Sequence, residues 1–243
     1  MGRFSYKDKI MIKKIVKKVM PQSLLYKYAY YKKQINNYII LAKEYGQFNT
    51  IKTGTCFDKN YEPIPWYTYP AIEYFKRLDF EDKTIFEYGC GNSSLFWANR
   101  VKRIISVESD KEWYHKILKE KSRNQEIILA KDKDEYIKSI NKFGLMFDVI
   151  IVDGLYRYDC VLTSIDYLKR DGMIILDNSD WFPKSSECLR QKNLIQIDFS
   201  GFGPVNNYTW STSIFINRDF DIKFLNKDEL MHPIGGLKDN AEK

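Results

Sequence analysis

Short apolar runs alternate with longer amphipathic segments through the part of the chain that follows residue 80. No run is longer than six residues, and each is rich in Ile, Val or Phe, which is typical of buried strands. These predicted strands span 84–88, 104–108, 126–130, 147–152 and 173–177. The segments between them, at 94–101, 110–121, 133–142 and 159–169, are predicted to be helices. Strands that alternate with helices indicate βαβ units and a parallel sheet.

Two further strand-like runs, at 194–199 and 212–217, follow the last predicted helix. The turn-rich segment GFGPVNNY joins them, so they are expected to pair as an antiparallel hairpin. The chain is therefore predicted to be an α/β protein. Its fold is a Rossmann-like doubly wound sheet that ends in an antiparallel hairpin.

The N-terminal part of the chain has a different pattern, which predicts a basic amphipathic helix ended by Pro21. Its apolar positions are Ile12, Ile15, Val16 and Val19, and its other face holds Lys13, Lys14, Lys17 and Lys18. Such a helix can anchor a protein on an anionic membrane surface or a partner. It can equally be a surface helix that packs its apolar stripe on the body. The pattern leaves both interpretations open.

A second helix is predicted over residues 23–45, and an aromatic-rich linker precedes a third at 70–78. The linker holds Pro63, Pro65 and Pro70, which exclude a helix there. We therefore divide the chain into a basic helical arm (1–62), a sheet domain (63–218) and a C-terminal tail (219–243). A length of 243 residues, 44% of them hydrophobic, suits one domain with a modest appendage.

The net charge of +7 belongs to the arm rather than to the sheet domain. Residues 1–33 hold ten Lys or Arg side chains and one acid, whereas the rest of the chain holds 29 basic and 31 acidic side chains. A nearly neutral body is not typical of nucleic-acid binding, so a nucleic-acid partner is not expected. An anionic membrane surface that contacts residues 1–33 is the partner that this charge favours.

The sequence also indicates a cytoplasmic location, with peripheral membrane contact through the arm as an extension. No stretch approaches 18 apolar residues, and the basic N-terminus lacks the apolar region of a secretory signal. The four cysteines are widely scattered without C-x-x-C spacing, so reduced thiols are expected rather than a zinc site or disulfide framework.

The candidate chemistry lies just after the predicted strands, because ligands of doubly wound sheets bind beyond the carboxyl ends of the strands. The first strand ends in the segment Glu87-Tyr88-Gly89-Cys90-Gly91-Asn92-Ser93-Ser94. Glycines at a strand-to-helix turn let the backbone approach a ligand closely. The third glycine of a dinucleotide motif is missing, and Glu87 would repel a pyrophosphate but attract an ammonium group. The second strand ends at Glu108, where an acid can accept hydrogen bonds from ribose hydroxyls.

Together, IFEYGCGNSS and IISVESD resemble the first two motifs of class I S-adenosylmethionine-dependent methyltransferases. The resemblance covers roughly residues 65–218, since that fold also adds an antiparallel hairpin after its fifth parallel strand. It implies S-adenosylmethionine as cofactor and a role for Glu108 at the ribose and for Asp132 at the adenine. The residues that it implies around the methionine part are Glu87, Gly89, Gly91 and Ser93.

The fourth and fifth strand ends are the candidates for catalysis. Asp153 ends the fourth strand with Arg157 close by, and Asp177-Asn178 end the fifth. Two carboxylates and an amide oxygen suit Mg²⁺ or a similar cation. Asp153, Asp177 and Asn178 also resemble the metal-binding set of catechol-type and caffeoyl-CoA-type O-methyltransferases. The other interpretation is that Asp-Gly forms a turn and Asp-Asn-Ser caps a helix.

We expect a methyltransferase that acts on oxygen. The (D/N)-P-P-(Y/F) motif of amino-directed nucleic-acid enzymes is absent, and no cysteine lies at the fourth or fifth strand end. Asp153 is the expected proton acceptor, directly or through a metal-bound acceptor oxygen. By analogy, the basic arm and the aromatic segment at 201–210 suit a saccharide or another small hydroxyl compound. The alternatives are a non-catalytic binding module at a membrane surface and a nicotinamide-dependent oxidoreductase.

Overall fold

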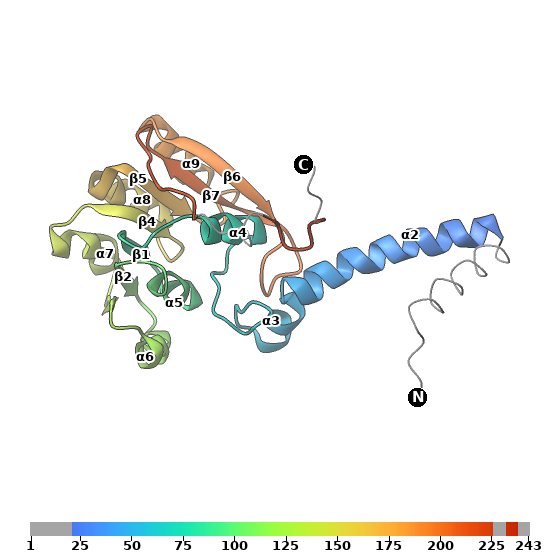
Figure 1. The fold of residues 1–243 in the computed structure, drawn as a ribbon. Coiled ribbons are helices and arrows are strands. Elements are labelled where there is room, and N and C mark those ends of the chain that lie inside the picture. The colour runs from blue at the N-terminus through green and yellow to red at the C-terminus, as the bar shows by residue number, and fades with distance from the viewer. Residues whose placement is uncertain (1–20, 226–231, 238–243) are drawn as a thin grey trace.

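A mixed seven-stranded sheet organises residues 21–225 and 232–237, which are the residues that the computed structural model describes (Figure 1). Its order is β3-β2-β1-β4-β5-β7-β6, in which β1 to β5 are parallel and β7 is antiparallel to both neighbours. The strands are β1 (Thr84–Tyr88), β2 (Arg103–Glu108), β3 (Gln125–Leu129), β4 (Phe147–Val152), β5 (Leu168–Leu176), β6 (Ile195–Gly201) and β7 (Trp210–Ile216). The predicted Rossmann-like sheet and its terminal hairpin are confirmed.

The described residues also form eight α-helices, several of which cover the two faces of this sheet. They are α2 (Gln22–Ile39), α3 (Gln47–Thr53), α4 (Tyr69–Arg77), α5 (Asn92–Ala98), α6 (Lys111–Glu120), α7 (Lys133–Lys138), α8 (Arg157–Ser164) and α9 (Pro183–Gln191). A wide turn, η1 (Ile40–Glu44), continues α2, and tight turns η2 (Ser139–Phe143) and η3 (Ile165–Tyr167) continue α7 and α8. The basic helix predicted around residues 12–19 lies outside the described residues. No helix in the described ranges is long and apolar enough to cross a membrane.

Three elements differ from the sequence-based prediction. The sequence pattern missed α3 and α9, although Pro183 at the start of α9 is a usual N-terminal signal. Strand β5 begins at Leu168, inside the helix predicted over 159–169. The cause is tertiary pairing: Phe147 aligns with Leu168, and the Asp148 carboxylate accepts a hydrogen bond from Lys169 Nζ at 2.9 Å. These contacts draw the start of β5 into the sheet.

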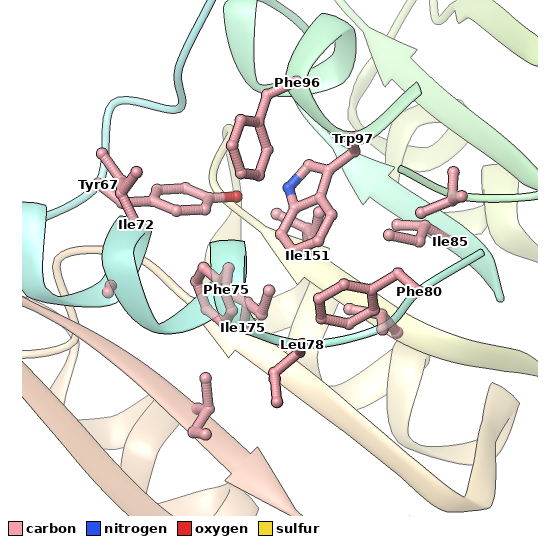
Figure 2. Packing of buried hydrophobic residues seen from close by; sticks show 14 of the residues in the cluster. Tyr67, Ile72, Phe75, Leu78, Phe80, Ile85, Phe96, Trp97, Ile151 and Ile175 are labelled. Atoms are coloured by element: carbon pink, nitrogen blue, oxygen red, sulfur yellow. The ribbon is translucent and has the colours of Figure 1, made fainter. Parts of the chain in front are cut away.

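Alternating strand residues divide the core into two apolar layers, one on each face. One layer packs against α4 and α5 and includes the aromatic cluster in Figure 2, where Trp97 lies among Phe75, Phe80 and Phe96. The other layer packs against α7, α8 and α9. Because β1, β4 and β5 are covered on both faces, their ends are held rigidly. The loops that follow these strands therefore start from fixed positions.

Phe75→Ala should lower the free energy of unfolding by about 3–5 kcal/mol, because Phe75 is fully buried and its removal leaves a cavity beside Trp97. Urea denaturation would measure this loss. Phe48→Ala is the matched control, since Phe48 is 60% exposed and its loss should change stability by less than about 0.5 kcal/mol. Similar losses for the two variants would contradict the packing described here.

Candidate functional site

The turn between β1 and α5 depends on Gly89 for its shape. Gly89 has φ +100°, a conformation that side chains disfavour, and a Cβ there would lie 3.1 Å from the Asp153 carbonyl oxygen. Gly154 is equally constrained, because its Cβ would lie 2.0 Å from the Tyr136 hydroxyl. The two glycines therefore let the ends of β1 and β4 approach each other closely. The concave surface above these two glycine turns is called the cradle below.

Beneath this turn lies Glu87, a fully buried carboxylate at the end of β1. It accepts hydrogen bonds from the hydroxyls of Ser93 at 2.5 Å, Ser106 at 2.7 Å and Ser94. Burial raises the pKa of Glu87 to about 7, although the three hydroxyls lower it. Glu87 therefore both braces the start of α5 and places a titratable acid at the floor of the cradle.

Glu108, at the end of β2, holds the same turn from the other side. Its carboxylate accepts hydrogen bonds from the backbone N–H groups of Cys90 at 3.2 Å, Ser109 at 2.7 Å and Asp110 at 2.8 Å. Three charge-assisted bonds of this kind fix the carboxylate in one position. Since each ionised carboxylate offers about four acceptor positions, Glu108 can accept a further hydrogen bond, and it lines the cavity described next.

A cavity of about 650 Å³, here named the Glu108 pocket, lies over this cradle. Of the predicted cofactor residues, Glu87, Gly89, Ser93 and Glu108 line it, and Gly91 lines the neighbouring pocket described below. Asp132 lines neither pocket. Its carboxylate instead accepts a hydrogen bond from the Glu135 backbone N–H at 2.8 Å and caps α7. The sequence pattern at the third strand end therefore reflects a helix cap.

The guanidinium of Arg157 connects the ends of β4 and β5. It donates to Gly154 O at 3.0 Å, Asn178 Oδ1 at 2.9 Å, Asp153 Oδ1 at 3.0 Å and the carbonyl of Asp177. Its side chain is only 13% exposed and packs 4.8 Å from the centre of the Phe182 ring. A rigid planar donor thus fixes both strand ends in one arrangement.

These contacts do not suit the predicted metal site of Asp153, Asp177 and Asn178. Oxygens of Asp153 and Asn178 face the Arg157 guanidinium, which already supplies a positive charge at their meeting point. The Asp177 carboxylate turns towards β7, where its Oδ1 accepts from Trp210 Nε1 at 3.1 Å and Thr212 Oγ1 at 2.5 Å. The described residues contain no group of three or more acidic, His or Cys side chains arranged to bind a metal. We derive no metal-dependent step.

Asp153 and Asp177 are both titratable, and they differ in exposure: the Asp153 side chain is partly exposed to both pockets, whereas Asp177 is buried. Burial raises the pKa of Asp153 to about 6, although the Arg157 guanidinium lowers it. Burial and the nearby Asp153 carboxylate raise the pKa of Asp177 well above its ordinary value. Hydrogen bonds from Thr212 and Trp210 oppose that shift. Near neutral pH, Asp153 is therefore the carboxylate of the pair that is ready to accept a proton.

Next to the Glu108 pocket lies a second cavity of about 440 Å³, here named the aromatic pocket. Four aromatic side chains line it: Trp66, Trp113, Trp181 and Tyr208. Its polar lining includes Asp177, Asn178 and Asn206. The two pockets share a wall formed by Cys90, Ser93, Asp153 and Arg157. A group bound in one pocket thus meets a group bound in the other at the carboxyl edge of the sheet.

Sequence reasoning missed most of the aromatic pocket, because its lining comes from separate segments. Trp113 belongs to α6 and donates its indole N–H to the Cys90 carbonyl at 2.5 Å, while Cys56 and Thr55 come from the predicted arm. In the 201–210 segment, Tyr208 lines the pocket and Trp210 is buried beside Asp177. Of these two aromatic side chains, only Tyr208 is therefore placed to contact a ligand, whereas Trp210 belongs to the buried interior.

Backbone strain also occurs close to the shared wall. Tyr156 (φ 52°), directly before α8, and Asn178 (φ 51°), in the turn after β5, both adopt the left-handed conformation. Such positions cost about 1–3 kcal/mol each, and they cluster at functional sites. The Arg157 hydrogen bonds to Gly154 and Asn178 hold these two turns in place.

No protein-family model matches the chain, and no curated protein matches it. Solved structures do resemble its fold. A precorrin-6y C5,15-methyltransferase from Geobacter metallireducens has a TM-score of 0.48 and 16% identity, over 61% of this chain and 88% of that one. The O-methyltransferase TomG from Streptomyces achromogenes, solved with S-adenosylmethionine, has a TM-score of 0.48 and 12% identity, over 60% and 76%. A spermidine synthase from Thermotoga maritima has a TM-score of 0.46 and 21% identity, over 63% and 65%.

Arg157→Ala should lower the free energy of unfolding by about 3–5 kcal/mol, because it leaves the largely buried Asp153 carboxylate without its cation and removes the hydrogen bonds to the turns after β4 and β5. Arg103→Ala is the matched control: Arg103 also pairs with a carboxylate, at 2.8 Å from Glu126, but the pair is 41% and 48% exposed. Its loss should cost no more than about 1 kcal/mol. Equal losses in urea denaturation would mean that Arg157 does not neutralise a largely buried carboxylate.

Proposed function

We propose that this protein is an S-adenosylmethionine-dependent methyltransferase that methylates a hydroxyl oxygen. The observation that carries the proposal is the shared wall. The Glu108 pocket, which contains the glycine turn and an acid suited to ribose hydroxyls, meets the aromatic pocket at Asp153 and Arg157. This arrangement suits a two-substrate reaction in which a group passes from a nucleoside cofactor to an acceptor.

The residues of the Glu108 pocket fit the cofactor chemically. Gly89 lines the pocket without a side chain, which suits close approach of the methionine part, and the buried Glu87 carboxylate suits its ammonium and sulfonium charges. Glu108 has acceptor capacity left for ribose hydroxyls, while its three backbone hydrogen bonds keep it in place. When bound, S-adenosylmethionine would supply an activated methyl group. No observation favours a nicotinamide cofactor, whose pyrophosphate Glu87 would repel.

In this proposal Asp153 would accept the proton of the acceptor hydroxyl, and the cofactor would supply the methyl group and leave as S-adenosylhomocysteine. Arg157 acts as a positioning residue, since it fixes the Asp153 carboxylate at 3.0 Å and keeps it largely ionised at neutral pH. The acceptor would lie in the aromatic pocket. A saccharide suits this pocket, because sugar rings stack on aromatic faces and sugar hydroxyls pair with groups such as Asn178 and Asn206. We place the reaction in the cytoplasm.

Glu108→Ala should weaken binding of S-adenosylhomocysteine by about 1.5–3 kcal/mol, which is about 10- to 150-fold in Kd, because hydrogen bonds to a charged acceptor are lost. Isothermal calorimetry on folded protein would measure this change. Asp132→Ala is the control: it removes the α7 cap, outside the pocket, and should leave affinity unchanged. If wild type does not bind the compound at all, the non-catalytic alternative gains support. Equal affinities of wild type and Glu108→Ala would remove Glu108 from the site.

Turnover of a candidate acceptor should depend on ionised Asp153. The pKa of Asp153 is raised to about 6, so kcat/KM should be level above that pH and fall about tenfold per unit below it. Asp153→Asn should lower kcat about 10²- to 10⁴-fold while cofactor binding persists. EDTA should leave the rate unchanged, because Arg157 occupies the meeting point of the oxygens. Loss of activity in EDTA, with recovery in Mg²⁺, would instead support the metal hypothesis.

A further inference from the structure

The long helix α2 carries an apolar stripe that no described part of the chain covers. Figure 1 shows α2 extending away from the sheet, and none of its residues is buried. Its apolar positions recur at intervals of four and three residues, so they fall on one side of the helix. This α2 stripe consists of Leu24, Tyr28, Tyr31, Ile35, Tyr38 and Ile39, which are between 37% and 63% exposed.

Within the described ranges, α2 has no packing partner along most of its length. Most helices in proteins are stabilised by packing of an amphipathic face rather than by intrinsic propensity. The 18 residues of α2 have no side-chain cap and no acidic residue in the first turn. A surface that buries the α2 stripe would supply the missing contacts.

The charged residues beside the α2 stripe indicate what kind of surface can bind it. At about 100° per residue, Lys27 and Lys32 flank the stripe on its two sides. The sequence holds nine lysines and no acid between residues 9 and 43. A surface that meets this helix must therefore carry negative charge. Pairing with a second copy would place lysines of one helix beside lysines of the other, in either orientation.

Three of the six stripe residues are tyrosines, which suit a boundary between apolar and wet layers. We propose that α2 docks on an anionic lipid surface through the α2 stripe. The stripe would lie at the level of the lipid headgroups, with Lys27 and Lys32 beside the phosphates. The inference goes beyond the proposed chemistry and assigns the contact to α2 rather than to the predicted helix at 12–19.

Sedimentation of the full-length protein with vesicles tests this proposal. The protein should bind vesicles of phosphatidylglycerol and phosphatidylcholine at low salt, and it should bind pure phosphatidylcholine or high-salt samples much less. Tyr28→Ser with Tyr31→Ser, on the stripe, should weaken partitioning about tenfold or more. Serine and tyrosine have similar helix propensities, so α2 should persist in circular dichroism.

The chain offers a matched control on the opposite side of the same helix. Tyr26 and Tyr30 are 79% and 54% exposed, and helix geometry places both off the stripe. Tyr26→Ser with Tyr30→Ser should leave partitioning within about twofold of wild type. Failure of the wild type to bind anionic vesicles would overturn the proposal. Equal binding by both double variants would assign the contact to another segment. A dimer in analytical ultracentrifugation that only the stripe variant dissolves would replace lipid with a second copy.

Discussion

The carboxyl edge of the sheet depends on the Arg157 guanidinium, which pairs with the Asp153 carboxylate and donates to the backbone carbonyl of Asp177. Asp153 and Asp177 follow neighbouring strands, and a positive charge beside them lowers the pKa of both acids. Arg157 supplies that charge, and its remaining donors hold the turns after β4 and β5. Because these turns form the shared wall of both pockets, the position of each pocket relative to the other follows from this guanidinium.

A second pair of acids acts in a similar way on the other half of the site. Glu87 is bound by three serine hydroxyls and Glu108 by three backbone N–H groups. Glu87 links the start of α5 to β2, and Glu108 links the turn after β1 to the segment after β2, so the glycine turn is held in place although glycine itself is flexible. The charges of this half of the site are therefore already bound by groups within the protein.

The sheet could be predicted from the sequence because its signal is local: buried parallel strands appear as short apolar runs, and their ends carry Gly89, Glu108 and Asp153. The role of each strand-end residue is harder to predict than the strands themselves, because that role depends on partners that are distant in sequence. Asp177-Asn178 matches a metal-binding pattern, yet the short motif does not reveal that Arg157 meets its oxygens. Asp132 matches a ligand position but serves as a helix cap. The aromatic pocket draws on segments whose proximity only the fold determines.

Helix α2 continues without a break into η1, so the number of residues in this segment decides which way the α2 side chains face. Tyr45 N–H donates to Ile40 O at 3.0 Å, so the wide turn keeps the path hydrogen-bonded to its end, and α3 follows at once. Each residue of a helix rotates what precedes it by about 100°. A single insertion or deletion here would therefore swing the outward-facing tyrosines around the axis while leaving every pocket residue unchanged. The direction in which the α2 stripe faces therefore depends on the number of residues in this segment as well as on their identity.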